Sequence, residues 1–385
     1  MFQQSRCLYN IGTKLLVPTQ NVSRQSYLFH GNLSSTVLQR RTISMLERSL
    51  MNPDNKIRSD LDHAISMVKK FDPSGYLPGL LLSNKDAKIG YYAIRAFWIE
   101  SGLRFKESPL NNSIAASRQI PGLGQRGTII SDDERIQRWK NGVEYLYGGS
   151  YFGKLEDNPT LRLLKHVVER HSLSKVYFDR IIRGREIDVN MKNYPTMKSL
   201  EDHVEMSCGS LLHLVLECDG ITQNTSENTS NDDVINETAR AVGLMHGLTN
   251  ALRLSVPTAS ATGKVIIPQE LCDKYEIKSP RYLLSALGMG DEECRRHLQS
   301  AVEDIANVAR HHLASARKNI DDLNSHPIGH YAMSAFLPAL ACETFLNRLE
   351  AHNYDLTDRT LRNVGKVEHL QCAGQLVVAS LQNKF

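Results

Sequence analysis

The chain has 385 residues, of which 41% are hydrophobic and 23% are charged, a balance typical of a folded soluble protein and not of a disordered or multispanning membrane chain. Its longest near-continuous apolar stretch, Phe336 to Cys342, falls far short of the about 20 residues that a membrane-spanning helix requires, so we expect no transmembrane helix. The net charge of +4 comes from the N-terminal segment, and the near-neutral remainder lacks the clustered basic surface that nucleic-acid binding requires.

The first 46 residues contain five basic residues and no acidic one. Leu8, Ile11 and Leu15 fall on one face of a helix, and Ser, Gln and Asn are frequent around them. An acid-free, Arg- and Ser-rich amphipathic segment is typical of a mitochondrial transit peptide. We therefore expect residues 1–46 to direct import and to be removed near Arg40 to Ser44. The alternative is a disordered polar N-terminus whose composition arose by chance.

Seven cysteines are scattered along the chain, and no two have the CxxC spacing of zinc-ribbon or thioredoxin sites. Cys7 would be lost with a transit peptide. We expect the other six to be small, buried, apolar side chains in a reducing compartment.

From Met45 to the C-terminus the hydrophobic pattern has helical periodicity without a convincing alternating strand pattern, which predicts an all-α fold. In the N-terminal half we expect helices at about 61–69, 85–102, 131–147, 158–171 and 199–217. The first of these ends before a predicted turn at Asp72 to Gly75. A capping box of Ser131 with Glu134 marks the start of the third, and Pro159 in the first helical position marks the start of the fourth.

The second half begins with a polar stretch, residues 222–233, which we expect to be a solvated loop. Beyond it we expect a helix at 234–254, a pair of helices between 291 and 323, and helices at 332–352 and 368–381. The other long irregular segment is the Pro- and Gly-rich stretch 107–130. Helices of the same character lie on both sides of each loop, so we expect residues 47–385 to form a single large helical domain.

Two segments resemble the squalene and phytoene synthases. Residues 91–97 (YYAIRAF) look like the first substrate-binding helix of that family, and residues 243–268 (GLMHGLTNALRLSVPTASATGKVIIP) look like the second. Residues 71–79 (FDPSGYLPG) and Arg185-Glu186 resemble, more narrowly, the branch known as complex I assembly factor 6 of mitochondria. The resemblance covers about residues 50–290, and the last hundred residues share only helical character. It implies a domain of the isoprenoid synthase type.

The resemblance also implies what an active synthase would need: two D-x-x-x-D clusters, whose carboxylates project from one helix face and hold Mg²⁺ against a diphosphate. The first cluster would fall at Ile99 to Leu103, where Glu100 is the only acid. The second would fall at Leu254 to Thr258, where there is none. His203 stands where the synthases have a Tyr on a central helix. We therefore expect no catalytic residue, no metal site and no cofactor.

Other pairs of acids or histidines do not replace these clusters. Two acid pairs have the i, i+4 spacing but lie away from the expected site, and we expect them to be solvated helix faces: Glu201 with Glu205, and Asp233 with Glu237. The histidine pairs lack the spacing of metal ligands, and we expect surface or capping roles for them: His311 with His312, and His166 with His171.

The family resemblance leaves a lining of basic, amide and aromatic side chains, with one acid, as the candidate ligand site: Tyr91, Arg95, Glu100, Asn250, Arg253 and Lys264. Such a lining could bind an anionic lipid headgroup or a prenyl diphosphate without turning it over. Alternatively, Arg95 and Arg253 are ordinary helix residues that pair with acids across the core.

In functional terms, the resemblance implies a catalytically inactive member of the family that acts as an assembly factor for mitochondrial respiratory complex I. Its partners would be complex I subunits or assembly intermediates, and it would lie in the matrix, peripherally associated with the inner membrane. Two alternatives remain open: an active prenyl transferase with displaced carboxylates, and a lipid-binding protein at the inner membrane.

Overall fold

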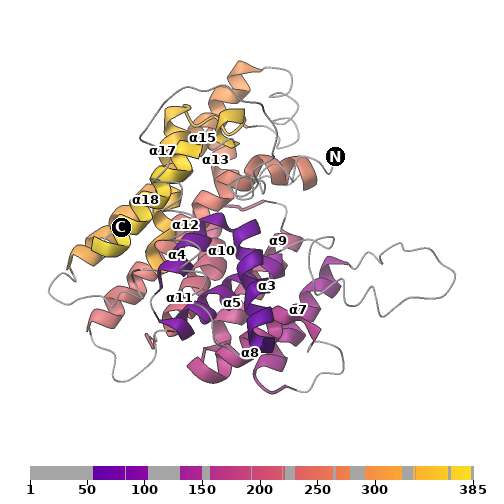
Figure 1. The fold of residues 1–385 in the computed structure, drawn as a ribbon. Helices are drawn as coiled ribbons and strands as arrows, with labels where there is room; N and C mark the ends of the chain where they lie inside the picture. Colours follow the sequence, from indigo (N-terminus) through magenta and orange to yellow (C-terminus); the bar gives the residue numbers. More distant parts are fainter. Residues whose placement is uncertain are drawn as a thin grey trace, which may run out of the picture.

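The computed structural model describes residues 55–82, 84–102, 131–149, 157–191, 193–218, 220–221, 230–262, 266–277, 291–322, 333, 335–362 and 366–382. Every regular element in these ranges is a helix (Figure 1), which confirms the all-α prediction. The expected transit peptide, the segment 107–130 and Lys264 lie outside the described residues. No described helix is long and apolar enough to cross a membrane.

The N-terminal half packs around one buried helix. Its helices are α3 (Asn55–Phe71), α4 (Pro73–Leu81), α5 (Lys85–Gly102), α7 (Asp132–Leu146), α8 (Pro159–His171), α9 (Lys175–Asn190), α10 (Met197–Val204), the π-helix η2 (Glu205–Gly209) and α11 (Ser210–Glu217). Helix α5 contacts α3, α4, α8, α9 and α11. Every residue from Ala87 to Phe97 is buried, as expected for a helix surrounded on all sides by others.

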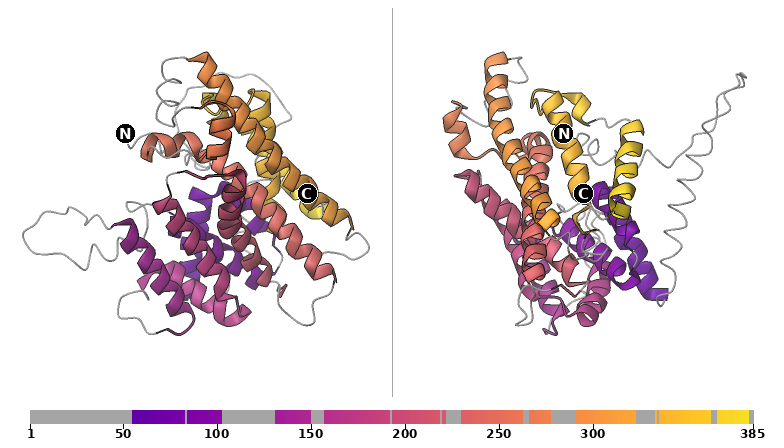
Figure 2. Two further views of the ribbon diagram at one scale, coloured as in Figure 1. Left: turned by 180° about the vertical axis from the view of Figure 1, so that it is seen from behind. Right: turned by 90° about the vertical axis from the view of Figure 1, so that its left-hand side faces the viewer.

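The C-terminal half is built on two long helices that lie side by side, α12 (Ser230–Thr262) and α15 (Glu292–Asp322) (Figures 1 and 2). The remaining elements are α13 (Gln269–Lys274), α17 (Pro338–Ala351), the 3₁₀ helix η3 (Arg359–Arg362) and α18 (Lys366–Gln382). Helix α12 also packs on η2, α10, α11 and α17, and α18 packs on α17 and α4. One hydrophobic cluster extends from Leu61 to Leu361 and so includes both halves of the chain.

Local capping signals locate several helix starts correctly. The Ser131 hydroxyl accepts the backbone N–H of Glu134 at 3.1 Å, and α7 follows directly. The Asn158 side chain accepts the N–H of Leu161 at 2.8 Å, with Pro159 in the first turn of α8. Helices α5 and α8 end where the hydrophobic pattern predicts.

Two predictions about the helices were wrong. The segment that begins at Asp72 is not a turn but the start of α4, because the Asp72 side chain caps Gly75 N–H at 3.1 Å and Pro73 occupies the first turn; Asp-Pro is a helix-start signal as well as a turn signal. The predicted pair of helices between 291 and 323 is one helix, α15.

Helix α12 is longer than predicted at both ends. It begins at Ser230, inside the expected loop at 222–233, and continues past Leu254 to Thr262. The predicted helix at 199–217 begins earlier, with Thr196 as N-cap, and contains the π-helical turn η2. A π-helical turn inside an α-helix often marks a functional or tightly packed site.

Candidate functional site

A buried ion pair joins α4 to α5. The Arg95 guanidinium bonds to the Asp72 carboxylate, and the two side chains are 0% and 5% exposed. The Ser74 hydroxyl also donates to Asp72, at 2.6 Å. Burial opposes ionisation of Asp72, but Arg95 together with the Ser74 hydrogen bond holds the pKa of this carboxyl below its usual range. Arg95 is therefore largely neutralised by a residue of the preceding helix.

The two tyrosines of α5 extend this contact. The Tyr91 hydroxyl donates to the Gly75 carbonyl and the Tyr92 hydroxyl to the Tyr76 carbonyl, each at 2.8 Å. The Arg95 guanidinium also lies over the Tyr91 ring, 4.8 Å from its centroid. A Cβ at Gly75 would come within 2.4 Å of Arg95 Nη1, so only glycine fits there without rearrangement. The motif at 71–79 thus forms the surface against which residues 91–97 pack.

Buried polar atoms without protein partners occur on both α5 and α12. Neither ring nitrogen of His246 and neither Nε nor Nη2 of Arg95 has a hydrogen-bond partner, and both side chains are buried. Burial, together with the nearby guanidinium groups of Arg95 and Arg253, lowers the pKa of His246 to about 4. His246 is therefore neutral at physiological pH. Buried polar atoms of this kind usually bond to water or to a ligand.

Asn250 and Arg253 lie together on α12, one turn beyond His246. Arg253 Nη1 donates to Asn250 Oδ1 at 3.2 Å, and its guanidinium lies 4.9 Å from the centroid of the Phe345 ring on α17. The structure therefore anchors Arg253 through an amide and an aromatic face.

Glu100 lies apart from Tyr91 and Arg95, although all three are on α5. Its carboxylate is fully buried and bonds to His63 Nε2 at 2.9 Å and to the Thr160 hydroxyl at 2.8 Å. Asn158 Nδ2 is 3.5 Å away. These partners come from α3, from α8 and from the residue that caps α8, so Glu100 joins three parts of the N-terminal half.

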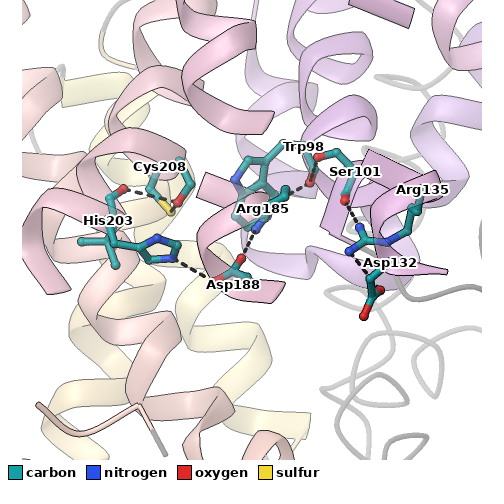
Figure 3. Close-up of polar contacts among 10 residues, drawn as sticks. Trp98, Ser101, Asp132, Arg135, Arg185, Asp188, His203 and Cys208 are labelled. Carbon is teal, nitrogen blue, oxygen red and sulfur yellow. Dashed lines mark hydrogen bonds and ion pairs between the residues drawn. The ribbon is translucent and has the colours of Figure 1, made fainter. Parts of the chain in front are cut away.

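Two arginines bind the C-terminal end of α5 (Figure 3). Arg185 of α9 donates to the Trp98 carbonyl at 2.8 Å, and Arg135 of α7 donates to the Ser101 carbonyl at 2.5 Å. The Arg185 guanidinium also lies 5.4 Å from the centroid of the Trp98 ring. Cations are stabilised at this end of a helix, where carbonyl groups lack helical partners and the dipole is negative. The resemblance places the first metal cluster of the synthases at this end of α5.

The same network continues from Arg185 to α10. Arg185 lies 3.5 Å from Asp188, whose other carboxylate oxygen is 2.9 Å from His203 Nε2 (Figure 3). His203, expected in place of a synthase Tyr, packs against the Tyr194 ring. Burial raises the pKa of the neighbouring Cys208 thiol to about 11, so this cysteine is protonated at neutral pH.

Several members of the remaining acid and histidine pairs have ion-pair partners on other helices. Glu201 bonds to His312 at 2.7 Å, which joins α10 to α15. Glu205 pairs with Arg180 and Arg240. In the part of the chain that the structure describes, no group of three or more His, Cys, Asp and Glu side chains is arranged to hold a metal ion.

Sequence reasoning missed Asp72, His246 and Arg135 as members of this region. Asp72 lies inside the recognised motif 71–79, but an acid that caps a helix gives no separate signal that it also pairs with an arginine 23 residues later. His246 lies inside the recognised segment 243–268, where nothing in the spacing indicates that both ring nitrogens face a buried polar region.

Comparison with protein families gives a match to the family described as squalene/phytoene synthase over residues 111–368. This span reaches further toward the C-terminus than the resemblance at about residues 50–290, and it begins after the segment 91–97.

Relatives of similar length are named as complex I assembly factors. A Drosophila melanogaster protein named NADH dehydrogenase (ubiquinone) complex I, assembly factor 6 homolog is 27% identical over 84% of each chain. A Dictyostelium discoideum protein of the same name is 25% identical over 98% of this chain and 96% of its own. The Homo sapiens protein named assembly factor 6 is 27% identical over 78% of this chain and 77% of its own.

Solved synthases share the fold at low sequence identity. A dehydrosqualene synthase superposes with a TM-score of 0.61 and 17% identity over 86% of this chain and 100% of its own. The squalene synthase of Alicyclobacillus acidocaldarius gives a TM-score of 0.55 and 13% identity over 79% of this chain and 97% of its own. The family match spans more than half of the present chain, so this chain belongs to the squalene/phytoene synthase family.

Proposed function

We propose that the protein is a non-catalytic assembly factor for mitochondrial respiratory complex I. It acts in the matrix, peripherally associated with the inner membrane, and its partners are complex I subunits or assembly intermediates. Relatives named as complex I assembly factor 6 align with this chain over 77–96% of their own length, which supports this role. In this proposal residues 1–46 are the transit peptide and residues 47–385 are one functional domain.

The observation that carries the non-catalytic part is the environment of Glu100. It is the single acid at the position expected for the first metal cluster, and its carboxylate is buried among His63, Thr160 and Asn158. A carboxylate that holds Mg²⁺ must direct its oxygens toward the ion. Oε1 of Glu100 already bonds to both His63 and Thr160, and Asn158 Nδ2 lies 3.5 Å from Oε2, so we assign this residue a structural role.

The facing helix supports the same conclusion. Residues 254–258 of α12 contain no acid; the Leu254 side chain is partly exposed, and the Ser255 hydroxyl bonds to the Ala251 carbonyl of its own helix. Two guanidinium groups bind the end of α5. Residues 254–258 therefore offer no carboxylate that could hold a divalent cation opposite Glu100.

Complementation tests this proposal. In cells that lack the protein, assembled complex I should fall on native gels, and the wild-type chain should restore it. Glu100→Gln keeps the size of the side chain and an acceptor for Thr160, so it should restore complex I equally well at equal abundance. An unchanged complex I level in the absence of the protein would refute the assembly role. A folded, abundant Glu100→Gln variant that fails to restore complex I would favour an enzyme.

A second candidate function is the binding of an anionic lipid headgroup or prenyl diphosphate without turnover. The unpartnered nitrogens of His246 and Arg95 favour it, and in this reading Tyr91, Asn250, Arg253 and Lys264 complete the lining. If Arg253 binds the anion, Arg253→Ala should reduce the retention of phosphatidylglycerol in native mass spectra while the melting temperature stays within a few degrees of wild type. Unchanged retention of phosphatidylglycerol by the variant would show that Arg253 is not part of the binding site.

A further inference from the structure

The C-terminal helix α18 is apolar on two opposite faces. Its inner face places Leu376 and Ala379, 2% and 8% exposed, in a small hydrophobic cluster with residues of α4 and α17. Its outer face carries Val377, Val378 and Leu381, which are 44%, 50% and 78% exposed. A helix on the surface of a protein usually has polar residues on its outer face, so the outer face of α18 requires a separate explanation.

This outer face is unusual within the described part of the chain. Five large hydrophobic side chains are exposed there, and three of them are the α18 residues; the other two are single residues on separate helices. From Ala373 to Gln382 the sequence has no charged residue. Depletion of charge around exposed apolar side chains is typical of the core of a protein interface.

The outer face has a protruding side chain and a recess at matching positions. Leu381 is the most exposed of its large apolar residues. Gly374, two turns earlier, has open space around its Cβ position beyond its own helix backbone, so the missing side chain leaves a recess in the stripe. At 100° per residue, Gly374, Val377, Val378 and Leu381 fall within an arc of about 100° around the helix. They form one continuous stripe.

We propose that the protein forms a two-fold symmetric dimer in which the α18 stripes of two copies pack antiparallel. An axis between Val377 and Val378 pairs each valine with the other valine of the second copy. The same axis places Leu381 of each copy over Gly374 of the other, so the protruding side chain fills the recess. An isologous interface requires this self-complementarity, and the uncharged stripe brings no like charges together.

The dimer should be weak. The stripe extends over about 10 Å of helix, and the area it buries is well below the roughly 800 Å² per partner of a standard interface. We expect a dissociation constant of roughly 10–100 µM. This proposal goes beyond the assembly role and does not depend on it.

Sedimentation equilibrium of the purified full chain over a range of concentrations tests the proposal. Wild type should change from monomer to dimer, and Leu381→Glu should remain monomeric with an unchanged helical circular-dichroism spectrum. Val176→Glu removes an exposed valine on α9 and is the matched control, which should dimerise as wild type does.

A second pair of variants tests the packing of Leu381 over Gly374. Gly374→Leu enlarges the apolar surface but fills the recess, so it should weaken the dimer at least tenfold. Adding Leu381→Ala to that variant exchanges the large and small positions and should restore dimerisation. A monomeric wild type at all concentrations, a dimer that persists in Leu381→Glu, or a Gly374→Leu variant that dimerises as tightly as wild type would each overturn the proposal.

Discussion

Asp72 has two roles that can be separated by mutation. Its carboxylate caps α4 through Gly75 N–H and also neutralises Arg95, which is fully buried. The first role needs only an acceptor oxygen, which asparagine also has. The second needs a negative charge.

We expect Asp72→Asn to lower the free energy of unfolding by about 3–5 kcal/mol, because Arg95 would remain buried without a counter-charge. Urea denaturation measures the change. The matched control is Asp86→Asn, which removes an exposed ion pair with Arg170 and should cost less than about 1 kcal/mol. A cost below about 1 kcal/mol for Asp72→Asn would mean that Arg95 does not depend on its partner.

Two buried histidines make the stability sensitive to mild acid. Burial lowers the pKa of both His246 and His213 to about 4, from 6.5. The folded state therefore binds fewer protons than the unfolded chain between pH 6.5 and about 4. Their neutral forms contribute stability that is fully present above pH 6.5 and is lost as the pH falls toward 4.

The free energy of unfolding should fall by about 2 kcal/mol per histidine between pH 7 and pH 5. His246→Gln should reduce this pH-dependent loss, whatever its effect at pH 7. The check is a series of urea denaturation curves from pH 7 to pH 5 for both proteins. Identical pH dependence in the two would show that His246 is not buried as a neutral group.

At the scale of elements, glycines on α12 allow close packing on the π-helix. A Cβ at Gly243 would lie 2.7 Å from the Gly209 Cα, and one at Gly247 would lie 2.4 Å from the Val204 Cβ. The Gly243 contact is with backbone, which cannot rotate away. The GxxxG spacing thus brings α12 against η2 and the end of α10, with His246 between the two glycines in the sequence.

Gly243→Ala should therefore lower the free energy of unfolding by about 1–3 kcal/mol or more, despite the higher helix propensity of alanine. Gly374→Ala is the matched control: nothing lies within 4 Å of its Cβ position, so it should be neutral or stabilising by up to about 1 kcal/mol in dilute protein. Thermal unfolding distinguishes the two. A neutral Gly243→Ala would contradict the close helix packing.

Sequence reasoning predicted helix starts better than helix connections. Ser131 and Asn158 cap helices through their own side chains, and such local chemistry is visible in the sequence. The Asp-Pro pair at 72–73 is compatible with either a turn or a helix start, and the contacts of this segment with Arg95 and Tyr91, far along the chain, are not visible in the local sequence. Similarly, the apolar pattern from 291 to 323 does not say whether one helix or two will pack on α12.

At the scale of the whole molecule, the helical periodicity of the hydrophobic pattern predicted an all-α chain, and the recognised motifs predicted its family. The candidate site was predicted less completely. Tyr91 and Arg95 do share one buried contact, but Glu100 bonds to α3 and α8 instead. Helix periodicity shows only approximately which face of a helix a residue occupies. Tertiary packing then decides which side chain it contacts there.

Import provides a test of the N-terminal segment. A fusion of residues 1–46 to a reporter should enter the mitochondrial matrix and be shortened, because the segment has five positive charges and no acid. Replacing Arg6, Lys14 and Arg24 with Glu should abolish import, since the membrane potential would then act on charge of the wrong sign. Protease protection in isolated mitochondria measures both. Undiminished import of the substituted segment would refute the assignment.

The central claim is that this synthase fold serves assembly and not catalysis. The most direct measurement incubates the purified chain with Mg²⁺ and farnesyl or geranylgeranyl diphosphate and quantifies released pyrophosphate. With Glu100 bound to α3 and α8, and no acid at residues 254–258, we predict no release above a protein-free control. Release that rises with protein concentration and stops when Mg²⁺ is chelated would contradict the claim.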